Sequence, residues 1–167
     1  GWFTYSLVSK SGVTVTLDGQ GADEQQAGYL LYLVQYFCHL QWRTIISEYK
    51  QFLQVPGSRA YILFGIAANI ARTLGLQKLF ISAARTFGFS TDPFLTVNEA
   101  LYTDIHNNLV SLLHFGDSNS MAHSIESRMP FMDYRLMEFW NKVPYAYKIH
   151  GGWTKYVARL AMNGKLP

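Results

Sequence analysis

The chain has 167 residues, enough for one domain with its own core, and 49% are hydrophobic against 15% charged, which excludes a disordered protein. An aromatic content of 16% favours large buried surfaces or a face that docks on another domain. The net charge of +3 comes from Lys and Arg residues spread without a dense run, so nucleic-acid binding is not expected.

The first predicted element is a strand at residues 13–17 (VTVTL), whose β-branched residues run into the turn residues Asp18-Gly19. Beyond Asp23 almost all of the sequence is predicted helical. Residues 24–54 have apolar positions at helical spacing and form one long helix or two. Pro56-Gly57 ends this pattern.

The remaining elements follow the same periodicity and are separated by turn residues. In chain order they are two helices within 58–88 that break at Gly75, a loop at 90–93, a helix at 97–115, a loop at 116–119 (GDSN), a short helix from Ser120 that ends at Met129-Pro130-Phe131, a helix at 134–141 capped by Asp133, and a last helix at about 153–163.

Two uncharged stretches, residues 25–42 and 60–71, are predicted as buried helices rather than membrane spans. The second falls short of the ~20 residues that cross a bilayer, and Gln, His and Gly interrupt the first. Cys38, the single cysteine, is predicted as a buried thiol that acts as a small hydrophobe. The lack of a disulfide pair fits a reducing compartment, and no signal peptide is visible.

This inventory of one strand and six or more helices makes the chain mainly α. A lone strand leaves backbone groups unpaired. It pairs either with a neighbouring copy or, more simply, with strands of a sheet that lies outside this chain.

The most informative stretch is Leu17-Asp18-Gly19-Gln20-Gly21-Ala22-Asp23-Glu24, between a strand end and a helix start. The two glycines let the backbone approach a ligand closely, and free N–H groups at the helix start favour a phosphate. The three carboxylates could hold Mg²⁺. The alternative is a glycine-rich turn whose Asp residues merely cap a helix, because the G-x-G-x-x-G pattern is not completed at Glu24.

With the Gly28-Tyr29 pair that follows, this stretch resembles the motif S/D-G-E/Q-G-A/S-D-E of glutamine-dependent asparagine synthetases. In that family the motif lies against the phosphates of ATP. The resemblance therefore implies ATP and pyrophosphate binding by Asp18, Gly19, Gln20, Gly21 and Asp23, with Asp23 and Glu24 as candidate Mg²⁺ ligands. The family often has Glu at position 20, where it is tied to formation of β-aspartyl-AMP; Gln20 keeps the hydrogen-bonding shape without the charge.

Residues 120–133 (SMAHSIESRMPFMD) resemble the same family still more closely. Every fixed position of its pattern S-M-A-x-S-x-E-x-R-x-P-F-L-D is met except one, where Met132 replaces Leu. The resemblance implies that Glu126 and Arg128 line the aspartate and acyl-adenylate pocket and, with Gln20, act in catalysis. On a helix two residues at this spacing would not face one another, but the end of the helix at Pro130 could still turn both toward one site. The alternative to a substrate role is an ion-pair network that holds a helix–loop–helix corner.

Two further comparisons with the family bear on substrate binding. Asp117 matches the acidic member of a D-R pair in the family and is a candidate for substrate binding, but Ser118 replaces the basic member, which would alter affinity or substrate choice. The C-terminal run from Lys155 to Leu166-Pro167 resembles K-x-x-L-R-x-A…L-P. Lys155 and Arg159 are predicted to share a helix face, more simply as a solvated basic surface.

The resemblance implies that residues 1–167 are the C-terminal part of a synthetase domain, within an α/β nucleotide-binding (PP-loop) fold. It implies ATP-dependent amidation of L-aspartate with glutamine-derived ammonia and Mg²⁺, in the cytoplasm, and leaves open a homodimer of the parent. The glutaminase domain, the S-G-G-x-D-S pyrophosphate loop and a lysine after L-P are absent from this sequence. We therefore expect the isolated chain to be inactive, since phosphoryl chemistry depends on positioned cationic and backbone donors.

Two other functions remain open on the sequence alone. A related ligase could amidate another carboxylate, such as a sugar acid or a β-amino acid, and the departures at Gln20 and Ser118 keep this possibility. A non-catalytic helical interaction domain is the alternative from a different class, against which the intact run at 18–24 argues.

Overall fold

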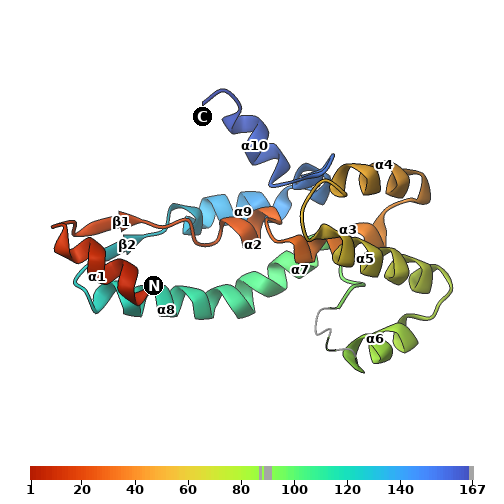
Figure 1. Ribbon diagram of the computed structural model, residues 1–167, viewed down its shortest axis with the longest axis horizontal. Coiled ribbons are helices and arrows are strands. Elements are labelled where there is room, and N and C mark those ends of the chain that lie inside the picture. Colours follow the sequence, from red (N-terminus) through yellow and green to blue (C-terminus); the bar gives the residue numbers. More distant parts are fainter. Residues whose placement is uncertain (87, 89–91, 166–167) are drawn as a thin grey trace. The chain divides into compact units, whose positions relative to one another are not determined.

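A computed structural model of the chain describes residues 1–86, 88 and 92–165 (Figure 1). The chain divides into two compact units, with boundaries inside the helices α2 and α7 and at the end of α9. The motif unit comprises Gly1–Gln25 and Leu101–Lys142, and the helical unit comprises Gln26–Ala100 and Val143–Pro167.

The motif unit contains two short strands among its helices. Its elements are α1 (Trp2–Lys10), β1 (Val15–Leu17), α2 (Ala22–Gln26), the end of α7 (Val97–Asp104), the π-helical turn η2 (Ile105–Leu109), α8 (Val110–Met121), β2 (Glu126–Arg128), the 3₁₀ turn η3 (Pro130–Met132) and α9 (Tyr134–Lys142).

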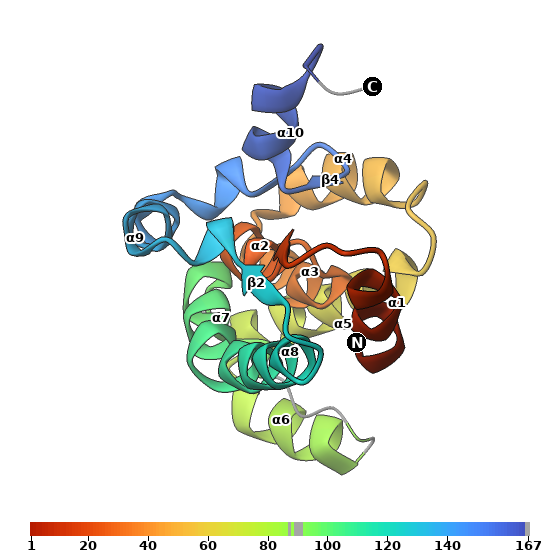
Figure 2. The same cartoon turned by 90° about the vertical axis from the view of Figure 1, so that its left-hand side faces the viewer.

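Strand β1 pairs in parallel with β2, and the two lie side by side in both views (Figures 1 and 2). The register places Val15 opposite Glu126 and Leu17 opposite Arg128. Within the described residues β1 is therefore not a lone strand, and the prediction that its partner lies outside the chain is wrong. Residues 126–128 were predicted in a short helix, but a three-residue strand has too few positions to show a period of two.

Helices α1 and α8 support this pair of strands. The ring of Trp2 lies edge-on to that of His123, with centroids 4.5 Å apart.

Helix α8 continues to Met121, so the predicted loop at 116–119 is helical. Two side chains bond back into the same helix, since Asn119 Nδ2 donates to the carbonyl of Phe115 at 2.7 Å and Ser120 Oγ to that of Asp117 at 3.0 Å. These bonds satisfy polar groups that would otherwise favour a turn.

The helical unit contains most of the helices. Its elements are η1 (Leu30–Tyr32), α3 (Leu33–His39), α4 (Trp42–Phe52), α5 (Ser58–Thr73), α6 (Gln77–Thr86), the start of α7, η4 (Tyr145–Tyr147), the antiparallel strands β3 (Ile149–His150) and β4 (Trp153–Thr154), and α10 (Tyr156–Met162).

The closest helix packing in this unit joins α3 to α5. A Cβ on Gly65 would lie 2.7 Å from the backbone oxygen of Val34, so only glycine allows the two helices to approach this closely. The buried Asn69 side chain donates to the carbonyls of Phe37 and Leu40, each at 2.9 Å, and so satisfies the C-terminal end of α3. Cys38 is buried, which confirms the prediction of a buried thiol. Its burial raises the pKa of the thiol to about 11.

The mainly helical class is confirmed, with corrections to individual elements. Residues 24–54 break into four short helices rather than one or two, because Ala27 takes a left-handed φ of 56° and Leu40 and Gln41 are extended. Trp153 and Thr154 belong to a β-hairpin, so the last helix begins at Tyr156. The breaks at Pro56-Gly57 and Gly75 are confirmed, whereas the predicted loop at 90–93 lies partly outside the described residues. Among the described helices none has the length and apolarity to cross a membrane.

Candidate active site

The loop that follows β1 is fixed at both ends by backbone hydrogen bonds. The Asp18 N–H donates to the carbonyl of Arg128 at 2.8 Å, which extends the β1–β2 ladder. The turn then closes where the Ala22 N–H reaches the carbonyl of Gly19 at 3.3 Å. The half-buried Asp18 carboxylate accepts a hydrogen bond from the Tyr5 hydroxyl at 3.5 Å. This loop thus presents a carboxylate and a glycine turn at the carboxyl end of a parallel strand, where ligands bind in α/β sheets.

Gly21 is the position in this loop that only glycine fits. Its φ is +88°, and a Cβ there would lie 2.7 Å from Met132 Sδ and 3.2 Å from Gln25 Nε2. The π-helical turn adds the buried side chain of Leu109 to the same contact, 3.7 Å from that Cβ position. The second glycine of the motif therefore combines a left-handed backbone with close packing.

The two motifs, about a hundred residues apart in the sequence, form one continuous structure. Besides the bond from Asp18 to Arg128, the Gln25 side chain donates through Nε2 to the carbonyl of Phe131 at 2.6 Å. The Tyr5 hydroxyl also lies 3.4 Å from Ser127 Oγ and so reaches both motifs from α1. The structure brings Asp18, Gly21 and Arg128 together through these contacts.

Glu126 and Arg128 form an ion pair on the exposed face of β2. Residues i and i+2 of a strand point to the same side, and Arg128 Nε donates to Glu126 Oε1 at 2.8 Å. The side chains are 62% and 58% exposed, for Arg128 and Glu126 respectively. The hydrogen bond from Arg128 lowers the pKa of Glu126. An exposed pair of this kind contributes little to stability, so the guanidinium can exchange its partner for the carboxylate or phosphate of a ligand.

The carboxylates of the first motif differ in their access to solvent. Asp23 is half-buried in the first turn of α2, whereas Glu24 is only 2% exposed. Helix α2 has five residues, so its aligned peptide dipoles are few and anion binding there depends on local N–H groups. No group of three or more His, Cys, Asp or Glu residues that could hold a metal occurs among the described residues. Mg²⁺ needs only one or two carboxylates when substrate phosphates complete its shell, and Asp18 and Asp23 fit that requirement better than Glu24.

The remaining predicted residues are less closely joined to this site. Gln20 is half-buried in the turn beside Gly21. Asp117 lies on α8 rather than in a loop; it is exposed, and no hydrogen bond or ion pair of the described residues joins it to Arg128. Lys155 and Arg159 belong to the helical unit, where Lys155 precedes α10 with a left-handed φ of 53°. The Leu166-Pro167 pair lies outside the described residues.

Three features near the site were missed from the sequence. Tyr5 bridges the two motifs, but nothing in the residues around it signals a contact made 122 positions away. Asp133 is held by Arg135, whose side chain and backbone N–H lower the pKa of the Asp133 carboxyl to about 2; the Asp133 cap itself was predicted. Ser124 ends the turn after α8 with a left-handed φ of 56°, a position where glycine would have been the signal.

Comparison with known proteins relates the whole chain to one family. The family model for asparagine synthase matches residues 1–167. The chain is 26% identical over 196 residues to asparagine synthetase [glutamine-hydrolyzing] 1 of Bacillus subtilis (strain 168), covering 95% of this chain and 29% of that protein. It is 42% identical over 60 residues to asparagine synthetase [glutamine-hydrolyzing] 3 of the same organism, covering 35% of this chain and 10% of that protein. No solved structure matches the chain significantly.

The chain thus spans 29% of the length of the first of these relatives. The family match extends over both motifs and over the helices between them. The glycine turn after β1 and the ion pair on β2, joined through Asp18 and Arg128, lie in the two stretches whose sequences resemble the family. The chain belongs to the asparagine synthase family.

Proposed function

We propose that this chain forms part of the synthetase site of an ATP-dependent ligase that amidates L-aspartate to L-asparagine through β-aspartyl-AMP, with ammonia derived from glutamine. The observation that carries the proposal is the backbone bond from Asp18 to Arg128, because it joins the two family motifs at the carboxyl end of one parallel strand pair. Both relatives named above are glutamine-hydrolysing asparagine synthetases, which supports the same acceptor and nitrogen source.

The glycine turn is suited to the phosphates of ATP. With no side chain at the exposed Gly19, the N–H groups of the turn can approach phosphate oxygens closely. Nothing lies within 4 Å of a Cβ position on Gly19, so that residue is open to a ligand. The Gln20 amide offers a donor and an acceptor to the adenylate.

Charge in the motif unit supports a divalent cation as part of the reaction. This unit contains eight Asp and Glu residues and four Lys and Arg residues, for a net charge of −4. A triphosphate would be repelled by this excess of carboxylates. Mg²⁺ held by Asp23 and Asp18 would neutralise phosphate charge as pyrophosphate leaves.

The ion pair on β2 is suited to the acceptor. Arg128 can bind a carboxylate of aspartate in two-point fashion, and Glu126 can bind its ammonium group. Because the pair is exposed and only two residues apart, both groups can turn to one ligand without loss of packing.

The test is the formation of asparagine and AMP by the full-length parent protein, given MgATP, L-aspartate and ammonium. We expect both products, and we expect Arg128→Gln to lower kcat/KM for aspartate by about 10–100-fold, as the loss of a charge-assisted bond predicts. Arg135→Gln is the matched control, since it removes another exposed guanidinium, from the Asp133 pair. Asp23→Ala should reduce both products and raise the Mg²⁺ concentration that is needed.

Other outcomes would change the proposal in defined ways. AMP without asparagine would indicate adenylation that lacks amide transfer. Activity with a sugar acid or a β-amino acid, and none with aspartate, would favour the related ligase. Neither product from a folded parent would favour the non-catalytic interaction domain.

We further propose that the reaction takes place in the cytoplasm and that the isolated 167-residue chain is inactive. Only four Lys and Arg residues belong to the motif unit, too few to neutralise a triphosphate and position it for in-line transfer. Aspartate-dependent AMP formation by the isolated chain would contradict this.

A further inference from the structure

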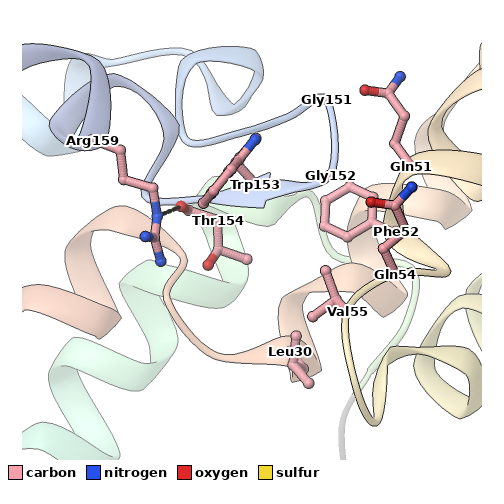
Figure 3. A pocket seen from close by; sticks show the side chains of 10 residues that line it. All are labelled: Leu30, Gln51, Phe52, Gln54, Val55, Gly151, Gly152, Trp153, Thr154 and Arg159. Atoms are coloured by element: carbon pink, nitrogen blue, oxygen red, sulfur yellow. Dashed lines mark hydrogen bonds between the residues drawn. The ribbon is translucent and has the colours of Figure 1, made fainter. Parts of the chain in front are cut away.

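A cavity of about 530 Å³ lies within the helical unit, between the end of α4 and the β3–β4 hairpin (Figure 3). Trp153 and Arg159 approach it from the hairpin side, and Leu30 and Val55 approach from the other. A volume of this size is typical of small-molecule sites, which run from about 300 to 1,000 Å³. Neither the glycine turn at 18–24 nor the stretch 120–133 contributes a residue to the lining, while Arg159 comes from the C-terminal run that resembles the family's K-x-x-L-R-x-A segment.

The hairpin wall of this cavity is fixed by contacts with α4. The N–H of Gly151 donates to both carboxylate oxygens of Glu48, at 3.1 and 3.3 Å, and Glu48 is only 4% exposed. Gly152 has a φ of +81°, and a Cβ there would lie 3.1 Å from the backbone oxygen of Gln51. These contacts hold the hairpin against the helix, so this wall of the cavity is preformed and the Glu48 carboxylate is engaged by the hairpin backbone.

Arg159 gives the cavity a cationic group in a fixed orientation. Its Nε donates to the carbonyl of Thr154 at 2.8 Å, and its guanidinium lies 5.0 Å from the centroid of the Trp153 ring. Among the described residues no carboxylate pairs with Arg159, and none lines the cavity. The terminal N–H groups of this guanidinium therefore remain for an anion that binds in two-point fashion.

The other lining groups favour a flat apolar body beside that anion. The Trp153 indole is 54% exposed and offers a face for stacking. Leu30 and Val55 supply aliphatic surface opposite, while the exposed amide of Gln54 can donate to or accept from a ring substituent.

We propose that this cavity binds an aromatic carboxylate, with the carboxylate on Arg159 and the ring between Trp153 and Val55. The site is separate from the proposed synthetase chemistry, because its residues all belong to the helical unit and none belongs to the glycine turn at 18–24 or to residues 120–133. The charge of the helical unit favours an anion, since the unit contains ten Lys and Arg residues and three Asp and Glu residues.

The test compares a charged with a neutral probe on the full chain. 2-Naphthoate and its uncharged amide, 2-naphthamide, have the same ring, and broadening of their aromatic proton NMR signals measures binding. We expect naphthoate to bind, and we expect Arg159→Gln to weaken it about tenfold while leaving naphthamide within about twofold. Arg85→Gln is the matched control, because it removes an exposed guanidinium of the same unit that does not line the cavity.

A second variant guards against a local fold change at Arg159, whose Nε also holds Thr154. Gln54→Trp fills the cavity from an exposed position and should abolish binding of both probes with the guanidinium intact. Circular dichroism confirms that each variant is folded. The proposal is overturned if naphthoate does not bind, if Arg159→Gln and Arg85→Gln have equal effects, or if Gln54→Trp leaves binding unchanged.

Discussion

The two units of the chain differ in the sign of their charge. The motif unit has a net charge of −4, with eight carboxylates against four Lys and Arg, while the helical unit has a net charge of +7, with three against ten. The mild overall value of +3 is the sum of these opposites. Composition averaged over a chain can therefore hide the acidic surroundings of one candidate site and the basic surroundings of another.

The units also differ in what holds them together. Of the 23 buried hydrophobic residues in the described part of the chain, six belong to the motif unit and the rest to the helical unit. The motif unit depends instead on specific bonds, such as those from Asp18 to Arg128 and from Gln25 to Phe131. The helical unit provides an apolar framework, whereas the motif unit relies on a few polar contacts between its motifs.

The largest expected effect concerns Lys148, the buried cation of the helical unit. It is 1% exposed, and its Nζ donates to Asn98 Oδ1 at 3.1 Å. Burial lowers the pKa of Lys148 to about 8 from an ordinary 10.5. Between these values the unfolded chain binds more protons than the folded one, so the free energy of unfolding rises with pH, by about 3 kcal/mol in total.

This dependence can be removed by one substitution. Lys148→Met should lack the rise in the free energy of unfolding that the wild type shows between pH 8 and 9, as measured by urea titration, whereas above pH 9 the buried Cys38 thiol lowers this free energy in both proteins. Lys142→Met, which removes an exposed lysine of the motif unit, should leave the dependence unchanged. Equal pH profiles for the wild type and Lys148→Met would contradict the assignment.

Glycine-to-alanine changes inside one helix of each unit should have opposite signs. In α5, the Cβ of Gly65→Ala meets backbone atoms of Val34 at 2.7 and 3.1 Å, which cannot repack, and we expect a net loss of about 2 kcal/mol. In α8, the Cβ of Gly116→Ala meets only Met129 Cε at 3.7 Å, and the gain in helix propensity should stabilise by about 1 kcal/mol. Thermal and urea unfolding of the two variants would measure both, and destabilisation by Gly116→Ala would contradict this account of the motif unit.

The glycine turn of the motif unit offers a finer comparison between two left-handed glycines. Gly12 has a φ of +77° and nothing within 4 Å of a Cβ position, whereas Gly21, at +88°, would place a Cβ against Met132 and Gln25. Substitution by alanine should cost about 1 kcal/mol at Gly12 from backbone strain alone and about 2 kcal/mol at Gly21. In the parent, only Gly21→Ala should also weaken MgATP binding; equal losses for both variants would remove packing from the explanation.

Sequence reasoning located the two motifs and the main helix breaks but not the pairing that joins the motifs. Pro56-Gly57 and Gly75 were found because turn residues act locally. The partner strand of β1 was not predicted, because the three residues Glu126-Ser127-Arg128 are too few to show a strand periodicity. Their pairing also depends on residues about 110 positions earlier in the sequence. The prediction of a loop at 116–119 was wrong for a related reason. The composition of Gly-Asp-Ser-Asn does not reveal the hydrogen bonds that the Asn119 and Ser120 side chains make within α8.

The candidate site divides in the same way. The residue types at Asp18, Gly21, Glu126 and Arg128 were predictable, because their chemistry and spacing match a family motif. The contact between the Glu126 and Arg128 side chains was not predictable, because on the predicted helix the two would point apart. The strand β2 places them on one side. The contribution of Tyr5 lay outside any motif.

The smallest expected effect concerns backbone strain at Ser124 in the second motif. The Ile125 N–H donates to the carbonyl of Ser120 and the Ser124 N–H to that of Met121, each at 3.0 Å, which is the Schellman arrangement that ends a helix. Ser124 occupies its left-handed position with a φ of 56°, where glycine carries no Cβ penalty. Ser124→Gly should therefore stabilise the chain by about 0.5–1 kcal/mol despite a looser unfolded state. Ser118→Gly is the control, because it lies inside α8 and should destabilise. A loss of stability from Ser124→Gly would mean that the serine side chain, rather than the turn geometry, holds the strand β2 at the end of α8.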